Sequence, residues 1–142
     1  MVAEALSWRR TPYHPCGRIK GLRGGVDCAC FIAEVYERAG VTPHIEIASY
    51  PPDWHLHQAG ERFLEQVLPR AQQVAAPEPG DLAMWRVGRA FAHAAIVLDW
   101  PRIIHADRDA RMVTEADARQ GRLVVNNDGT PRLVKFFSPD RP

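Results

Sequence analysis

The segment that most constrains the fold is residues 24–31, which read Gly-Gly-Val-Asp-Cys-Ala-Cys-Phe. Two glycines let the backbone enter a turn in conformations that other residues avoid. Asp27 can cap the first amides of a helix, which places Cys28 on the first helical residue. There the helix dipole and the N–H groups favour thiolate over thiol. We therefore predict that Cys28 is a nucleophile with a pKa below that of an ordinary thiol.

Apolar residues after Cys28 recur at steps of three and four, as in a helix with one buried face. They are Phe31, Ile32, Val35, Tyr36 and Ala39. Gly40 suits the left-handed conformation that follows a helix end, and Pro43 comes soon after it. The pattern predicts a helix that begins at Cys28 and ends before Gly40.

The chain has 142 residues, of which 46% are hydrophobic, and this suits one domain that spans residues 1–142. Its net charge of +1 comes from 18 basic and 17 acidic residues, so no basic tract predicts a nucleic-acid partner. No apolar run approaches a membrane span. Residues 1–8 lack the apolar run of a signal peptide, so we expect synthesis in the cytoplasm and retention there unless another component exports the chain.

Three cysteines are an odd number, and a domain of this size does not depend on disulfides, so we expect thiols. Cys30 competes with Cys28 for the role of nucleophile. Residues two apart in a helix point to nearly opposite sides, however. We interpret Cys30 as a small buried apolar residue and Cys16 as an incidental loop thiol.

The remaining pattern is helical in the first half of the chain and extended in the second. Helical spacing occurs at residues 2–9 and 56–68, with a brief extended piece at residues 45–47 and turns at residues 49–54. Strand-like segments follow at residues 82–87, 91–98 and 102–106. We expect a short irregular or helical stretch at residues 114–120, then a closing hairpin of residues 123–125 and 133–137 around an Asn-Asn-Asp-Gly turn. This order indicates an α+β fold.

A cysteine nucleophile needs a base that takes its proton, and the base needs a third group that orients it. Histidine has a suitable pKa, and of six histidines only His93 and His105 lie in predicted strands. The alternative for each is a buried histidine that hydrogen-bonds to the backbone. If the strands around Asp99 form a hairpin with an odd-length loop, both side chains emerge on one face within mutual reach. With Cys28 they would form a Cys-His-His relay.

Several segments between Trp8 and Ala106 together resemble the NlpC-like cell-wall cysteine peptidases. They are the Thr-Pro-Tyr-His loop, Asp-Cys before a helix, Pro-Gly-Asp before a strand, and the strands Phe-Ala-His-Ala-Ala-Ile-Val and Ile-Ile-His-Ala. The resemblance implies a papain-like fold with N-terminal helices packed on a central antiparallel sheet. It also implies hydrolysis of peptide bonds in peptidoglycan stem peptides, typically between D-γ-glutamate and a diamino acid.

The likeness extends to site residues. Cys28 matches the nucleophile of the family, His93 the general base and His105 the third polar residue. Tyr13 matches a tyrosine whose hydroxyl faces the nucleophile, and the Cys28 backbone N–H is expected to help hold the oxyanion. The chain departs from the family after the cysteine, where it has Ala-Cys and many members have Ser-Gly.

The sequence looks closest to the branch encoded by tailed phages and prophages, whose members are short and lack signal peptides. These members carry similar Tyr-His and Trp-x-Leu-His segments, here at residues 13–14 and 54–57. The resemblance implies peptidoglycan stem peptides as substrate, phage tail proteins as partners, and action at the cell wall as a virion component. The chemistry requires no metal and no organic cofactor.

Two other functions stay open. A zinc-binding module would use His14, Cys16, Cys28 and Cys30, but a one-residue gap inside a helix splays the last two ligands apart. A papain-like fold that has lost catalysis would serve as a virion structural part, although the chain retains a Cys-His-His set. The remaining pair, His55 and His57, is interpreted as surface histidines.

Overall fold

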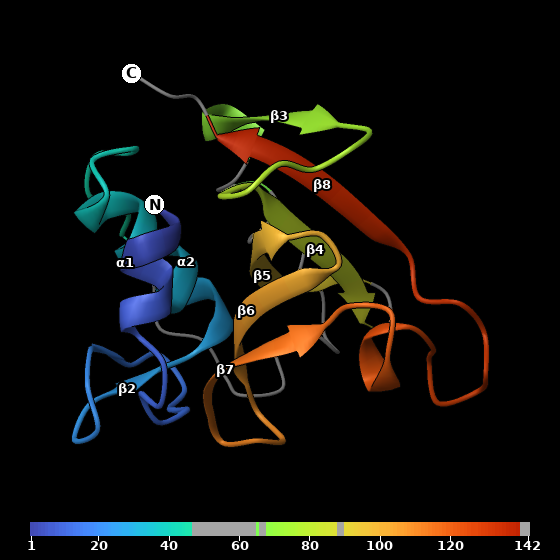
Figure 1. Ribbon diagram of the computed structural model, residues 1–142, viewed down its shortest axis with the longest axis horizontal. Coiled ribbons are helices and arrows are strands. Elements are labelled where there is room, and N and C mark those ends of the chain that lie inside the picture. Colours follow the sequence, from blue (N-terminus) through green and yellow to red (C-terminus); the bar gives the residue numbers. More distant parts are fainter. Residues whose placement is uncertain (47–64, 66–67, 88–89, 140–142) are drawn as a thin grey trace.

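Two helices pack on one face of an antiparallel sheet in the computed structural model of this chain, which describes residues 1–46, 65, 68–87 and 90–139. The helices are α1 (Val2–Ser7) and α2 (Cys28–Arg38), and Figure 1 shows both on the same side of the strands. A small antiparallel pair, β1 (Arg18–Ile19) and β2 (Gly25–Val26), leads into α2. The arrangement agrees with the α+β, papain-like class predicted from the sequence.

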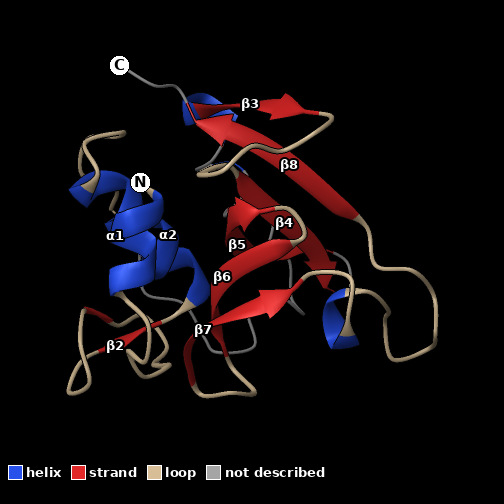
Figure 2. Ribbon diagram, in the orientation of Figure 1, coloured by secondary structure: helices blue, strands red, loops and turns tan. Residues whose placement is uncertain are grey.

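The main sheet has six strands in the order β3-β8-β4-β5-β6-β7, and every neighbouring pair is antiparallel. The strands are β3 (Ala71–Val74), β4 (Leu82–Val87), β5 (Ala90–Asp99), β6 (Arg102–Asp107), β7 (Met112–Asp117) and β8 (Val134–Pro139). Two 3-10 turns, η1 (Leu68–Arg70) and η2 (Gly121–Leu123), lie in the connections. Figure 2 shows the sheet as the largest element of the molecule.

Both faces of the central strands are buried, as alternation in β5 predicts. On the helix side, Ala94 and Ile96 pack with Phe31 and Val35 of α2. On the opposite side, the smaller core contains Ala83, Trp85, Ala95, Val97, Ile103 and Ala118. The three predicted strands are therefore confirmed, and β5 is central, between β4 and β6.

Helix α2 begins and ends as its sequence predicts. Asp27 has extended backbone, and its Oδ1 accepts a hydrogen bond from the Cys30 N–H at 2.9 Å. Phe31 and Val35 are fully buried, and Gly40 has a φ of +72° just past the helix end. The cap and the apolar stripe are therefore confirmed.

The two glycines before α2 are required for a different reason from the one predicted. Neither Gly24 nor Gly25 has a positive φ among the residues that the structure describes. A Cβ at Gly24 would overlap the Ile19 carbonyl, and a Cβ at Gly25 would lie 2.6 Å from the His14 Cβ. The glycines thus allow three backbone segments to approach one another closely, rather than an unusual turn conformation.

The prediction of an irregular or helical stretch at residues 114–120 is wrong in its first half. These residues begin within β7, which pairs with β6 and places Thr114 opposite His105. Strand β7 has only one neighbour in the sheet, and an edge strand carries polar side chains that hide the alternating pattern. Its Glu115 contacts Arg9 and Arg102 instead of the core.

The predicted closing hairpin is only partly correct. The turn forms, because Asn126 N–H donates to the Thr130 carbonyl at 2.8 Å and a single bridge joins Val125 to Pro131. Residues 121–123, however, form η2 rather than a strand, and β8 pairs with β4 and β3. Burial of Phe137 between those strands outweighs the local pairing.

Strand β3 was not anticipated from the sequence. Expectations for residues 47–64, including the turns, His55, His57 and most of the second helix, lie outside the described residues. Within the described residues, no helix combines the length and apolar character needed to cross a membrane.

Candidate active site

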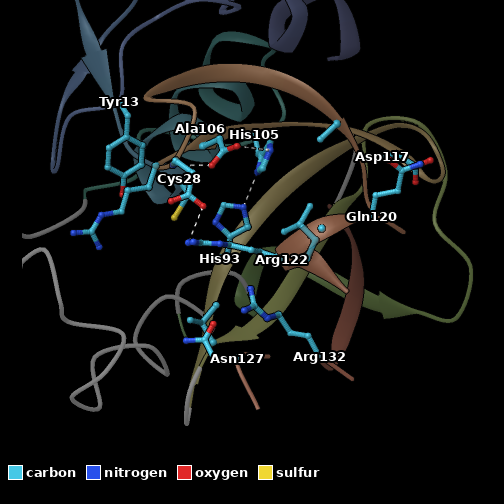
Figure 3. A pocket seen from close by; sticks show the side chains of 17 residues that line it. Tyr13, Cys28, His93, His105, Ala106, Asp117, Gln120, Arg122, Asn127 and Arg132 are labelled. Atoms are coloured by element: carbon cyan, nitrogen blue, oxygen red, sulfur yellow. Dashed lines mark hydrogen bonds and ion pairs between the residues drawn. The ribbon is translucent and has the colours of Figure 1, made fainter. Parts of the chain in front are cut away.

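A cavity of about 520 Å³ lies where the start of α2 meets strands β5 and β6 (Figure 3). Its lining includes Tyr13, Cys28, His93 and His105, the four residues singled out from the sequence. In Figure 3, Cys28 lies between Tyr13 and His93. The fold therefore brings together side chains from three separate parts of the chain.

Cys28 is the first residue of α2 and is 9% exposed. Burial raises the pKa of its thiol to about 12, and the negative charge of Asp27 acts in the same direction. Backbone N–H groups of Ala94, Ala29 and Cys28 itself favour the thiolate but do not offset burial. The predicted lowering of the Cys28 pKa is therefore wrong for the resting site, because tertiary burial outweighs the helix start.

Asp27 accepts hydrogen bonds from both α2 and the loop that precedes it. Its side chain is buried, with Oδ1 bound to Cys30 N–H and Oδ2 accepting a hydrogen bond from Cys16 N–H at 2.7 Å. A carboxylate that holds two backbone amides sets the position of the helix start relative to the preceding loop. Asp27 thus acts as the predicted cap and also anchors the loop that carries Tyr13.

The two histidines contact each other directly. His93 Nε2 and His105 Nδ1 are 2.7 Å apart, and their rings meet edge-on with centroids 5.0 Å apart. Ile96 pairs with Ile104 and Val97 with Ile103, a register that makes His93 and His105 diagonal neighbours on one face. The predicted contact on a shared face is confirmed.

The far nitrogen of His105 points toward a carboxylate. His105 is 4% exposed, and its Nε2 has no hydrogen-bond partner within the described part of the chain. Asp107 Oδ2 lies 3.9 Å from this nitrogen, too far for a hydrogen bond but close enough for charge attraction. Burial lowers the pKa of His105, whereas the charge of Asp107 acts to raise it.

Tyr13 lines the side of the cavity next to Cys28. Its backbone N–H donates to the Arg111 carbonyl at 2.8 Å, and a bridge joins it to Val26 beside the helix start. Burial, and next the charge of a Cys28 thiolate, raise the pKa of Tyr13. Its hydroxyl therefore keeps its proton and can donate a hydrogen bond into the cavity.

The other cysteines do not compete for this position. Cys30 is 2% exposed and belongs to the helix-side core, and burial raises its pKa as well. None of the three cysteines forms a disulfide. Among the described residues, no group of three or more His, Cys, Asp or Glu side chains is placed to hold a metal ion, so the alternative zinc site has no support there.

Three residues of the site were missed by sequence reasoning. Asp107 follows His105 by two residues in a strand, so the alternation that paired the histidines also places it on their face. Arg122 and Arg132 line the same cavity from the connection between β7 and β8. No spacing in the sequence signals these arginines, because only the path of that connection brings them to the site.

A sequence model of the NlpC/P60 family matches residues 10–126, which include Tyr13, Cys28, His93 and His105. No curated protein matches the chain by sequence.

Solved structures with the same fold include the NlpC/p60 domain of the peptidoglycan hydrolase SagA. The TM-score is 0.55 and the identity is 25%, and the match covers 83% of this chain and 86% of the SagA chain. NlpC1 from Trichomonas vaginalis has a TM-score of 0.62 and 14% identity over 97% of this chain, which spans only 42% of NlpC1. RipD from Mycobacterium tuberculosis, described as non-catalytic and adapted to peptidoglycan binding, has a TM-score of 0.53 and 21% identity over 94% and 92% of the two chains.

Proposed function

This chain belongs to the NlpC/P60 family, and from that membership we propose that it is a cysteine peptidase that hydrolyses amide bonds in peptidoglycan stem peptides. The observation that carries the proposal is the Cys28 thiol in one cavity with the His93–His105 pair. A thiol, an imidazole and a group that orients the imidazole are the components of nucleophilic acyl transfer.

In the first half of the reaction, the Cys28 sulfur attacks the amide carbonyl carbon while its proton passes to His93. Because His93 Nε2 contacts His105, the nitrogen that takes this proton is Nδ1. The tetrahedral oxyanion is held by the Cys28 N–H at the start of α2, and the Tyr13 hydroxyl is a second donor near it. His93 then gives the proton to the leaving amine, and the C–N bond breaks to leave a thioester.

In the second half, His93 Nδ1 takes a proton from water, and the resulting hydroxide attacks the thioester carbonyl. The new tetrahedral intermediate expels the Cys28 sulfur, which recovers the proton from His93. The products are a free carboxylate and a free amine. A high resting pKa for Cys28 fits this scheme, in which the proton leaves as attack occurs rather than from a preformed thiolate.

For the bond cleaved, we propose the link between D-γ-glutamate and a diamino acid. The support is the resemblance of the Tyr-His loop, the Asp-Cys helix start and the two histidine strands to peptidases with that specificity. We also propose that the protein acts at the cell wall as part of a phage virion, with tail proteins as partners. Its support is the resemblance of residues 13–14 and 54–57 to phage and prophage members.

A catalytically inactive module is the second candidate, favoured by the likeness of the fold to RipD, which is described as non-catalytic. Retention of Cys28, His93 and His105 in one cavity argues for the peptidase. An inactive module would bind peptidoglycan fragments without changing them, so a single digestion experiment separates the two functions.

The test is digestion of purified muropeptides, with identification of the new termini by mass spectrometry. We expect a new D-γ-glutamyl carboxyl terminus and a new diamino-acid amine. Cys28→Ala is expected to abolish the products, and Cys16→Ala, at a loop thiol outside the cavity lining, serves as the matched control that keeps them. Binding of fragments by the wild-type protein without new termini would favour the inactive module.

A further inference from the structure

Two arginines line the cavity on the side away from Tyr13. Arg122 follows the first residue of η2, and Arg132 lies just before β8. Figure 3 shows both below the His93 ring. Their like charges are close enough that Arg122 contributes to lowering the pKa of Arg132, although burial is the larger cause.

Arg132 has no acidic counter-ion in the part of the chain that the structure describes. It is half-buried, and its Nε donates to the neutral Asn126 Oδ1 at 3.3 Å. Within the described residues, no acidic side chain pairs with it. A half-buried guanidinium beside a second cation is unfavourable unless an anion binds there, and its planar fork of donors matches a carboxylate.

The acidic side chains that line the cavity have other contacts. Asp109 pairs with Arg122 at 3.0 Å, and both side chains are mostly exposed. Asp117 pairs with Arg119, and Asp107 faces His105. The carboxylates therefore leave the positive charge of Arg132 unneutralised, while Arg122 is held by an exposed pair that an incoming anion can exchange.

We propose that Arg132, assisted by Arg122, binds a free carboxylate of the substrate next to the scissile amide. The proposal rests on the proposed peptidase function and adds to it a requirement for substrate charge. A γ-linked glutamyl residue leaves its α-carboxylate free beside the bond, and the residue on the amine side carries a carboxylate of its own. Both offer the same ligand chemistry to Arg132.

The experiment compares three synthetic peptides, L-alanyl-γ-D-glutamyl-diaminopimelate and two forms in which one carboxylate is a carboxamide, at the glutamyl or at the diaminopimelyl residue. For wild type, we expect kcat/KM to fall about 10- to 100-fold for one of the two carboxamides, because a charge-assisted pair is lost. The peptide that suffers the loss identifies which carboxylate Arg132 binds. In Arg132→Gln, the peptide with unmodified carboxylates is expected to be cleaved no better than that carboxamide.

Two further variants separate a binding role from a structural one. Arg132→Lys keeps the charge and is expected to recover part of the discrimination, whereas Arg119→Gln, at a neighbouring exposed arginine outside the cavity lining, is expected to keep all of it. Equal cleavage of the three peptides by wild type, or unchanged discrimination in folded Arg132→Gln, would overturn the proposal.

Binding provides a readout that does not depend on turnover. Titration of the three peptides into Cys28→Ala is expected to show weaker binding of the same carboxamide, and addition of Arg132→Gln to this variant is expected to remove the difference. If wild type cleaves none of the peptides, the proposed function fails. The carboxylate site is then judged by the titration alone, and equal affinities would overturn it.

Discussion

His93 Nε2 lies 2.7 Å from His105 Nδ1, and in the proposed mechanism this contact determines which nitrogen of each ring carries a proton. For Nδ1 of His93 to accept the Cys28 proton, neutral His93 must carry its proton on Nε2 and donate it to His105. His105 then carries its own proton on Nε2, the buried nitrogen 3.9 Å from Asp107. In this mechanism the proton relay runs from Cys28 through His93 to His105, and the Asp107 carboxylate faces its far end.

The position of each histidine in the relay predicts the relative size of the mutational effects. His93→Ala removes the proton carrier and is expected to lower kcat by about a thousandfold or more. His105→Ala removes only the group that orients His93, a role that water partly replaces, so its loss should be about one to two orders of magnitude smaller. Steady-state rates on a purified muropeptide provide the measurement.

Added imidazole gives a control for these two variants, since it is expected to restore part of the activity of His93→Ala and none of that of Cys28→Ala. Far-UV circular dichroism checks that both histidine variants keep their secondary structure. A larger loss in folded His105→Ala than in His93→Ala would remove His105 from the relay as an orienting group.

Asp107 is predicted to act on the relay through charge. Its carboxylate raises the pKa of His105 against the effect of burial, so Asp107→Asn should move the His105 titration to lower pH. The same loss of charge destabilises a protonated His93–His105 pair, and we expect kcat to fall about tenfold. Nitrogen-15 NMR of the ring nitrogens measures the titration and the tautomer.

Asp107→Glu keeps the charge and is expected to recover most of the rate, which a purely structural role would not produce. Asp99→Asn changes an exposed carboxylate at the last residue of β5 and should alter neither quantity. An unchanged His105 titration in Asp107→Asn would show that the carboxylate does not act on the ring.

The parts of the site that could be predicted are those set by local periodicity. The alternation in β5 and β6 placed His93 and His105 on one face, and the loop-to-helix signal placed Cys28 at the start of α2. These patterns depend on neighbours within a few residues, so they survive without knowledge of the rest of the fold.

Long-range properties could not be read from the chain. The pKa of Cys28 depends on how deeply the sheet and the Tyr13 loop bury its sulfur, and burial reversed the shift expected from the helix start. Arg122 and Arg132 reach the cavity only because the connection after β7 returns to β8 instead of forming a local hairpin. Such features are determined by tertiary pairing, which the sequence pattern does not encode locally.

Gly25 tests how closely the segments before α2 must pack. In Gly25→Ala the new Cβ would lie 2.6 Å from the His14 Cβ, so the backbone must shift, at a cost of about 1–3 kcal/mol in the free energy of unfolding. Because the shift occurs two residues before Asp27, kcat/KM should fall as well. Urea unfolding and muropeptide kinetics measure the two effects.

Gly40→Ala is the matched control at the opposite end of α2. Gly40 has a φ of +72° and nothing within 4 Å of an added Cβ, so the substitution strains the backbone by about 1 kcal/mol without moving the helix start. We expect lower stability and unchanged kcat/KM. Full activity in Gly25→Ala would show that the close approach to His14 does not position Cys28.

The resting ionisation of Cys28 predicts its reactivity toward alkylating agents. Burial raises the pKa of the thiol to about 12, and only the thiolate reacts. The rate of iodoacetamide labelling should therefore still rise with pH above 9.0, the ordinary pKa of a cysteine thiol. Labelling of the separate cysteines, followed by mass spectrometry of peptides, gives the rate for each thiol. A plateau well below that pH would instead reveal a thiolate–imidazolium pair in the resting enzyme.

The same pKa shift links Cys28 to stability, and the sign follows from proton binding. Between the ordinary value of 9.0 and about 12, the folded chain keeps a thiol proton that the unfolded chain has lost.

Because the unfolded state binds fewer protons than the folded state between 9.0 and about 12, the free energy of unfolding falls as the pH rises through that window. Below the window both states hold the thiol proton, and the contribution of Cys28 is constant and fully present. Cys28→Ala removes the group, so its stability should decline less steeply than that of wild type as the pH rises above 9.0. Urea unfolding of both proteins across this range measures the difference, with Cys16→Ala as the control. Parallel curves for wild type and Cys28→Ala would show that burial does not hold the proton on the Cys28 thiol.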